Sequence, residues 1–389
     1  NKSHAAAYAL IAYQTAFLKT YYKEDFIAAT MSTELTNTSK LREFVEELKR
    51  LKIEIIRPSI NECFAEFKAD NNKIFYGLGA VKNVGFEAIS NIIDERKKNG
   101  KFKSLYDFIS RVSSKDVNKL QLEGLTKSGS LDVFDKDRNK ILNSIPKIIQ
   151  QIKNVNEDKL SNQKSLFVED KNEDKNFDFI KSVRWSKKEL LAEEFKSLGF
   201  YISDHPLNEY NEVFNHLKIS SYDNFLKNKE SEASVAGTIM SIQEKKSIKG
   251  TPFAIVKFSD NQGEFELFLF AETLIKNRDK LKESESFVMT LQKDKLSNSS
   301  LQRRISVRKI LSLEEVVKKP YKQVTVELTE NFKLQELKNL FNTEGETVVK
   351  LAFKEKNKKI YYHLQNPRKF DFNQLKTLKS KEYVKKIVV

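Results

Sequence analysis

The segment from Gly77 to Gly85 has the residue types of a turn that binds phosphate. It reads Gly-Leu-Gly-Ala-Val-Lys-Asn-Val-Gly and precedes an apolar helical pattern. Small residues let a backbone approach a phosphodiester closely, and the N–H groups at the start of a helix attract phosphate oxygens. The alternative is a glycine turn between two helices that has no ligand. The candidate contacts with a DNA duplex are Gly79, Lys82, Asn83, Val84 and Gly85.

This pattern is typical of a helix-hairpin-helix motif, with one departure at Asn83. The motif usually has glycine there because the bend requires a left-handed backbone, and asparagine is the best substitute for glycine in that conformation. Residues 118–127, followed by Ser128-Gly129-Ser130, predict a second helical unit of the same domain. Paired units of this kind hold the backbone of a duplex without reading its bases.

Aromatic and basic residues occur together between residues 233 and 313, where the hydrophobic pattern has a period of two. Aromatic faces can stack on unpaired bases, while lysine and arginine bind phosphates. We expect a hairpin loop at residues 245–250, whose lysines have no packing role. For the phenylalanines the alternative is a place in the core, which we favour for Phe265. The candidate single-strand contacts are Lys245, Lys246, Lys249, Phe253, Phe268, Phe270, Arg303 and Arg304.

A short apolar motif interrupts the polar segment of residues 143–179. Gln163-Lys164-Ser165-Leu166-Phe167 places two large apolar side chains in a stretch rich in lysine, asparagine and aspartate. Such a motif can dock into a pocket of a partner protein, and the alternative is a chance local contact. The candidate docking residues are Gln163, Ser165, Leu166 and Phe167.

No residue pattern in this chain predicts catalysis. Nucleotidyl transfer requires acidic residues at strand ends that hold two metal ions. Asp135 and Asp137 follow a turn and precede an expected helix, where capping of that helix is the favoured role. The four histidines are scattered, and we expect His205 to be a turn residue before Pro206. We therefore predict neither a metal site nor a catalytic residue here.

The elements that position these residues indicate a multidomain α+β protein. Residues 4–22 and 40–51 are expected to form helices, with the aromatic residues of the first packed in a core. Five strands with a helix between the third and fourth, over residues 233–313, follow the order of an OB-fold β-barrel. The βαββαβ order of residues 324–389 predicts a small split-βαβ sandwich.

These patterns divide the chain into six expected parts. The apolar start without an initiator methionine leads us to expect a piece of a longer protein. The parts are the end of a helical domain at 1–60, a helix-hairpin-helix domain at 61–140, a polar linker at 141–185, a helical connector at 186–230, an OB-fold at 231–315 and a C-terminal domain at 320–389.

The charge of the chain indicates a polyanionic partner. Its 389 residues include 69 Lys and Arg against 54 Asp and Glu, which gives a net charge of +15. Residues 318–389 contain 17 basic and 8 acidic residues, so the excess gathers toward the C-terminal end. The alternative is ordinary solvated lysine. The single Cys63 and the lack of a long apolar run fit a cytoplasmic protein.

Four stretches resemble the alpha subunits of bacterial DNA polymerase III, the C-family replicative polymerases. The most specific is Leu-Gly-Phe-Tyr-Ile-Ser-Asp-His-Pro-Leu at residues 198–207. The order also agrees with that family: end of fingers, helix-hairpin-helix domain, clamp motif, connecting helix, OB-fold and C-terminal domain. The matching stretches are residues 1–20, 76–85, 102–108 and 189–210.

The resemblance implies a role in template-directed DNA synthesis. The parent protein would extend a primer with Mg²⁺ held by palm carboxylates that lie upstream, so we expect this chain alone to be inactive and to hold no cofactor. It would bind the primer-template duplex through residues 83–85 and guide the single-stranded template with the OB-fold. Lys2, Ser3 and His4 would lie near the incoming nucleotide.

The resemblance also implies protein partners. Residues 163–167 would bind the beta sliding clamp, with Gln163 at the edge of the pocket and Leu166 and Phe167 inside it. Residues 320–389 would meet the tau subunit of the clamp loader. The exonuclease subunit would bind only an N-terminal region that is absent here, and no membrane contact is expected. The place of action would be the nucleoid in the bacterial cytoplasm.

A competing hypothesis is a non-enzymatic DNA-binding or repair accessory protein that combines a helix-hairpin-helix with an OB-fold. It predicts DNA binding without a clamp motif. A third hypothesis is an RNA-binding protein, which would read the 2′-hydroxyl groups. The sequence does not separate a main replicase from an error-prone paralogue.

Overall fold

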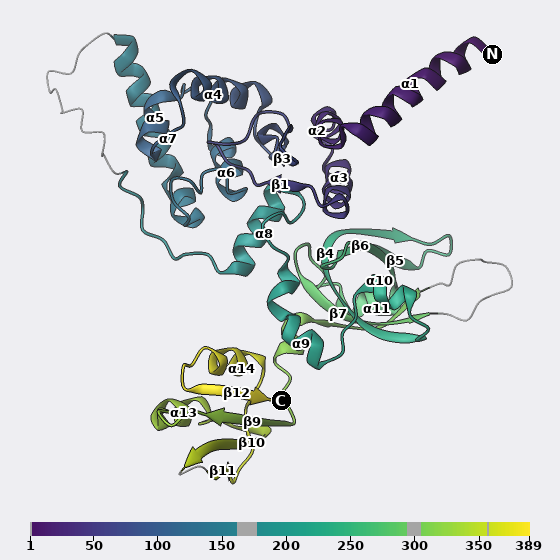
Figure 1. The fold of residues 1–389 in the computed structure, drawn as a ribbon, viewed down its shortest axis with the longest axis vertical. Helices are drawn as coiled ribbons and strands as arrows, with labels where there is room; N and C mark the ends of the chain where they lie inside the picture. Colours follow the sequence, from purple (N-terminus) through teal and green to yellow (C-terminus); the bar gives the residue numbers. More distant parts are fainter. Residues whose placement is uncertain (1, 162–176, 294–304, 356–357) are drawn as a thin grey trace. The chain divides into compact units, whose positions relative to one another are not determined.

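The computed structural model describes residues 2–161, 177–293, 305–355 and 358–389. The chain divides into two compact units, Asn1–Pro206 and Leu207–Val389, which are considered separately. The boundary falls inside the expected helical connector of residues 186–230. Figure 1 shows the elements of both units in sequence colours.

The first unit begins with three helices, α1 (Lys2–Tyr21), α2 (Lys23–Thr33) and α3 (Thr38–Leu51). The α3 helix has one apolar side, which packs in the core, and the side chain of Asn37 caps its start. The expected burial of the α1 aromatics is wrong, because Tyr13, Phe17 and Tyr21 are all exposed. The helix is apolar on every side, and the ring of Phe17 lies 4.7 Å from that of Tyr21.

A three-stranded sheet follows, made of β1 (Glu54–Ile56), β2 (Lys68–Asp70) and β3 (Lys73–Phe75) in the order β1-β3-β2. It leads into the 3₁₀ turn η1 (Leu78–Ala80). The helices after it are α4 (Phe86–Asn99), α5 (Leu105–Arg111), α6 (Lys119–Lys127), α7 (Arg138–Ser161) and α8 (Lys187–Leu198). The hairpin of residues 81–85 thus lies between one 3₁₀ turn and the α4 helix.

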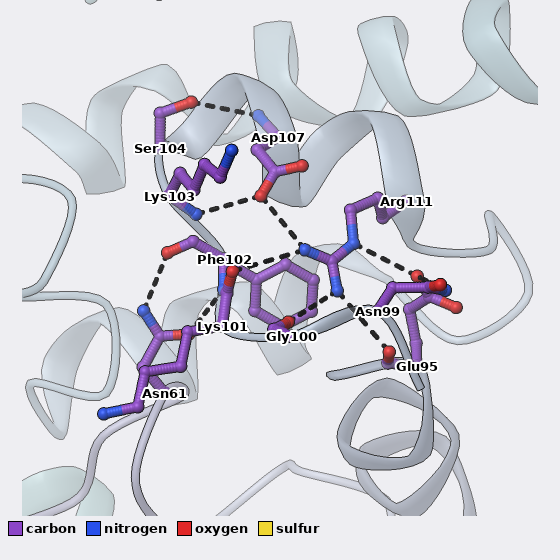
Figure 2. Close-up of polar contacts among 10 residues, drawn as sticks. All are labelled: Asn61, Glu95, Asn99, Gly100, Lys101, Phe102, Lys103, Ser104, Asp107 and Arg111. Atoms are coloured by element: carbon purple, nitrogen blue, oxygen red, sulfur yellow. Dashed lines mark hydrogen bonds and ion pairs between the residues drawn. The ribbon is translucent and has the colours of Figure 1, made fainter. Parts of the chain in front are cut away.

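The turn between α4 and α5 is held by Arg111. Its guanidinium donates to the Gly100 carbonyl at 2.7 Å and to the Asp107 carboxylate at 3.0 Å, and it covers the ring of Phe102 at 4.4 Å. Asn61 exchanges two 2.8 Å hydrogen bonds with the backbone of Phe102. Figure 2 shows these groups converging on the turn. Because the planar guanidinium can donate to several acceptors at once, Arg111 of α5 binds both α4, through Glu95, and the turn that follows it.

The second unit contains η2 (Pro206–Tyr210), α9 (Asn211–His216), α10 (Tyr222–Lys227) and a five-stranded antiparallel sheet. The strands are β4 (Glu232–Lys246), β5 (Pro252–Ser259), β6 (Glu264–Phe270), β7 (Ser286–Lys293) and β8 (Ile305–Ser312), in the order β6-β5-β4-β7-β8. The β6 and β8 edges also approach each other, and α11 (Ala271–Asn277) lies between β6 and β7 in the chain. The inner face is a core that includes Phe265, as expected.

The C-terminal part follows the order α12 (Leu313–Val317), β9 (Gln323–Leu328), α13 (Leu334–Leu340), β10 (Glu344–Glu355), β11 (Lys358–His363), α14 (Phe372–Lys379) and β12 (Val384–Val388). The sheet order is β11-β10-β9-β12. The predicted split-βαβ arrangement is wrong, because β9 and β10 are direct parallel neighbours with no strand between them. The α13 and α14 helices pack on the same side of this sheet, where Val324, Val326 and Val349 are buried with Leu337 and Leu375.

Candidate nucleic-acid interface

The hairpin of residues 81–85 points several unpaired backbone N–H groups outward. Asn83 adopts the left-handed conformation, with φ +67°, and both Asn83 and Gly85 are exposed. In the described part of the chain, no acceptor receives the N–H of Asn83, Gly85 or Phe86. The first N–H groups of a helix have no partner within it, so these groups lie at the positive end of the 14-residue α4 helix. This arrangement can hold an anion.

The other predicted hairpin residues have structural partners. The N–H of Gly79 donates to the Ala65 carbonyl at 2.9 Å, and that of Lys82 donates to the Ser197 carbonyl at 2.9 Å. A Cβ at Gly79 would lie 2.9 Å from both Ala65 and the ring of Phe86, so glycine is needed there for packing. Val84 is buried. Of the five candidates, Lys82 can offer its exposed ammonium, while Asn83 and Gly85 can offer backbone N–H groups.

The α6 helix packs against the hairpin. This helix lies within the second helical unit expected at residues 118–127, and Asn118 caps it by accepting from the Gln121 N–H at 2.9 Å. A Cβ at Gly124 would lie 2.5 Å from the Lys82 carbonyl oxygen, so the helix and the hairpin are in direct backbone contact. The hairpin can approach α6 this closely because Gly124 has no side chain.

The α8 helix also supports the hairpin, which sequence reasoning missed. Besides the bond from Lys82 to Ser197, this helix carries Glu194, whose side chain is buried. Glu194 Oε1 accepts the N–H groups of Ile202 and Ser203, both at 2.9 Å, and its Oε2 lies 3.8 Å from Arg138 Nη1. A buried carboxylate needs such partners, and no local pattern in the sequence indicated that Glu194 would be buried.

We call residues 199–203 the strap, because they tie several parts of the first unit together. Gly199 ends α8 in the left-handed conformation, with φ +85°, and its carbonyl accepts from Arg42 at 2.7 Å. The Ser203 carbonyl accepts from Arg57 at 2.8 Å. Most of the string that resembles the polymerase family therefore has a structural role, joining α3 to the helices that carry the hairpin.

In the second unit, aromatic side chains gather on the outer face of β5 and β6. Phe253 pairs with Phe270 and Ile255 with Phe268 across these strands, and paired residues share a face of the sheet. Phe268 is 42% exposed and Phe270 is 52% exposed. We call these four residues the aromatic face. Its flat exposed rings can stack on unpaired bases.

The lysines predicted beside this face lie partly in a strand. Lys245 and Lys246 belong to β4 instead of a loop, since this strand extends further than the sequence indicated. Lys245 pairs with Phe253 and so lies on the aromatic face, whereas Lys246 pairs with Pro252 and lies on the other. Lys249 is exposed in the tight turn between β4 and β5. Lys245 is therefore placed to meet a phosphate beside a stacked base.

Of the remaining predicted site residues, the structure places only His4. His4 is exposed on α1, but the side chains of Lys2 and Ser3 lie outside the described residues. The rest also lie outside the described residues, namely Gln163, Ser165, Leu166, Phe167, Arg303 and Arg304.

The acidic and nucleophilic groups have structural roles. Asp137 caps α7 by accepting from the Lys140 N–H, as predicted. Partial burial of Asp135 opposes a lower pKa, but hydrogen bonds from Lys140 and the Asp137 N–H hold its pKa below the usual value. Burial raises the pKa of Cys63 to about 11 and lowers the pKa of His205 to about 4, so both are neutral near pH 7. Within the described ranges, no group of three or more His, Cys, Asp or Glu side chains could hold a metal.

A comparison with protein families finds one match in the region that contains the hairpin. A family profile described as a helix-hairpin-helix motif matches residues 52–141. Among the described residues, no helix is both long and apolar enough to cross a membrane.

Curated relatives cover most of the chain. It is 33% identical over 376 residues to the DNA polymerase III subunit alpha of Borreliella burgdorferi, which covers 94% of this chain and 32% of the relative. The protein of the same name from Caulobacter vibrioides is 35% identical over 284 residues, covering 72% and 25%. That of Helicobacter pylori is 38% identical over 296 residues, covering 70% and 24%. The chain thus spans about a third or less of these relatives, and the resemblance inferred from the sequence is confirmed.

Proposed function

We propose that this chain, a relative of DNA polymerase III alpha subunits over most of its length, is the part of such a subunit that holds DNA and its replication partners. The hairpin carries this proposal, because it presents unpaired N–H groups at the N-terminus of α4 beside the exposed Lys82. Backbone donors of this kind bind phosphates without reading sequence, which suits an enzyme that must copy any template. The relatives' name supplies the wider context of DNA synthesis.

The second unit is proposed to be an OB-fold followed by a C-terminal domain that contacts the tau subunit. The strand order β6-β5-β4-β7-β8, with β6 near β8, supports a barrel of this type. OB-folds bind nucleic acid on the face of their second and third strands, which correspond to β5 and β6 here. The aromatic face lies on these two strands, so a single-stranded template is the proposed ligand.

The remaining functions are proposed from the resemblance. Gln163, Ser165, Leu166 and Phe167 would bind the sliding clamp, and Lys2, Ser3 and His4 would lie near the incoming nucleotide. The palm carboxylates and their Mg²⁺ would belong to another part of the parent protein. We propose that this chain alone does not synthesise DNA and that the parent acts in the bacterial cytoplasm.

Lys82→Glu is expected to weaken binding of a blunt duplex about tenfold and to lower the salt slope of log K by about one, because one phosphate contact becomes repulsive. Fluorescence anisotropy with a labelled duplex over a series of salt concentrations measures both quantities. Lys98→Glu is the matched control, since Lys98 is exposed at the opposite end of α4. Equal losses in the two variants would show that the hairpin is not the duplex site.

Replacing Phe268 and Phe270 together by alanine is expected to weaken binding of a 20-nucleotide oligothymidine by about tenfold or more, because stacking on each ring is worth about 1–3 kcal/mol. Duplex binding should stay within about twofold, since the duplex is assigned to the hairpin. Leu226→Ala, which removes an exposed apolar side chain from α10, is the control. Unchanged oligothymidine affinity in the double variant would exclude the aromatic face as the single-strand site.

A further inference from the structure

One face of the C-terminal sheet carries a group of lysines with few acidic neighbours. Strand register places Lys350, Lys354 and Lys359 on the same face, since Lys350 pairs with His363 and Lys354 with Lys359. Lys386 of β12 joins them through its pairing with Glu327, which shares this face with Ala352 of β10. We call this surface the lysine face. It is defined by Lys350, Lys354, Lys359, Lys386, Tyr361 and His363.

The described helices of this part do not cover the lysine face. The α13 and α14 helices pack on the opposite side, against a core that includes Val324, Val326 and Val349. Because side chains alternate along a strand, the residues between these valines point to the other side of the sheet. Tyr361 is 55% exposed, and Lys354, Lys359 and Lys386 are also exposed. The sheet therefore has one packed face and one face open to a ligand.

This face carries more positive than negative charge, although Glu327 on the same face interacts with the charges of Lys359 and Lys386. Lys359 pairs with Glu327, Nζ to Oε2 at 3.1 Å. In the described part of the chain, no carboxylate lies within ion-pair distance of Lys350, Lys354 or Lys386. The lysines of this face repel one another, and a bound anion would reduce that repulsion. The face is complementary to a polyanion.

The aromatic residue among the lysines favours one class of polyanion. Tyr361 lies on β11 between Lys359 and His363, and Lys359 Nζ is 5.7 Å from the centre of its ring. An exposed ring beside lysines offers a stacking surface and phosphate contacts together, a combination that suits unpaired bases. A duplex presents phosphates but no free base faces, so a duplex would leave the ring of Tyr361 unstacked.

We propose that the lysine face is a second binding site for single-stranded nucleic acid, separate from the aromatic face of β5 and β6. Phosphates lie against Lys350, Lys354 and Lys386, and a base stacks on Tyr361. This site goes beyond the contacts proposed above, which assign residues 320–389 to a protein partner. It lengthens the stretch of unpaired strand that the chain can hold.

The test is oligothymidine binding by the whole 389-residue chain with Lys350, Lys354 and Lys386 all changed to glutamate. Each phosphate contact on a single strand contributes about 0.7 to the salt slope, so the slope should fall by about two and the affinity at least tenfold. The matched control changes Lys333, Lys338 and Lys379 to glutamate. These exposed lysines belong to the region of α13 and α14, and the control alters the net charge equally.

A second measurement locates the contact without any substitution. Lysines of the wild-type chain are acetylated with and without a 40-nucleotide oligothymidine, and the protection of each is read by mass spectrometry. Protection of Lys350, Lys354 and Lys386 but not of Lys333 and Lys338 supports the proposal. Equal salt slopes in the two triple variants, with no selective protection, would overturn it, even if the Phe268 and Phe270 variant shows that the aromatic face binds DNA.

Polyglutamate of matched charge serves as the competitor in the same assay. The proposal requires that it protects these lysines much less than oligothymidine does, since it cannot stack on Tyr361. Equal protection by polyglutamate, together with no loss of oligothymidine affinity in Tyr361→Ala, would assign the face to an acidic protein instead.

Discussion

Gly124→Ala is expected to lower duplex affinity by about tenfold or more, although the substitution lies inside a helix. The new Cβ would lie 2.5 Å from the backbone carbonyl oxygen of Lys82, which must move by several tenths of an ångström. Val84 and Val81, at 3.4 and 3.6 Å, leave little room for the helix to shift instead. The hairpin would therefore lose the position in which its N–H groups meet a phosphate. Anisotropy with a labelled duplex measures the affinity.

The effect on stability should be smaller than the effect on binding. Alanine is better than glycine in a helix by about 1 kcal/mol, which offsets part of an overpacking cost of about 1–3 kcal/mol. Chemical denaturation measures the net change. Gly263→Ala, where a Cβ meets no atom within 4 Å, is the control and should change neither quantity. A destabilised Gly124→Ala protein with full duplex affinity would contradict the assigned role of the hairpin.

Gly199→Ala is expected to lower the free energy of unfolding of the first unit by about 2–4 kcal/mol, from strain and overpacking together. Gly199 has φ +85°, a conformation that side chains disfavour, and its Cβ would lie 2.1 Å from Thr38 Cγ2. The strap that it begins also binds Arg42. The measurement is denaturant-induced unfolding of the whole chain, followed by a probe in the first unit.

A double-mutant cycle with Thr38→Ala separates the two causes. Removing Cγ2 leaves the nearest remaining Thr38 atom at 3.4 Å from the added Cβ, which is an ordinary contact distance. The double variant should therefore be more stable than the sum of the single changes predicts, by at least about 1 kcal/mol. Additive losses would mean that the backbone conformation at Gly199, and not its contact with α3, accounts for the whole effect.

Local patterns in the sequence were sufficient for many elements. The Asp137 cap of α7 follows from a side chain that bonds a backbone group three residues away. The left-handed conformation of Asn83 follows from the same kind of local preference. Alternation of side chains along β6 placed Phe265 inside and Phe268 outside. These interactions involve neighbours in the chain, so they are visible without a fold.

Contacts between residues distant in the chain could not be predicted from local sequence patterns. The sequence contains no local sign that the Lys82 N–H donates to Ser197, or that Glu194 of α8 holds the strap. The prediction of packed aromatics on α1 was wrong because apolar composition shows a preference for burial but not whether a neighbour exists. The split-βαβ prediction was wrong because element order leaves the adjacency of strands open.

The sequence by itself determined that this chain resembles DNA polymerase III alpha subunits, that residues 77–85 match the pattern of a helix-hairpin-helix motif, and which residues alternate along the strands. Only the tertiary structure decided which backbone N–H groups of the hairpin remain free to bind a ligand. The N–H groups of Gly79 and Lys82 donate to carbonyls of residues distant in the chain. The tertiary structure also decided that the C-terminal lysines gather on one open face, because strand register aligns residues from three strands. Both results depend on pairings across the fold, which no local pattern specifies.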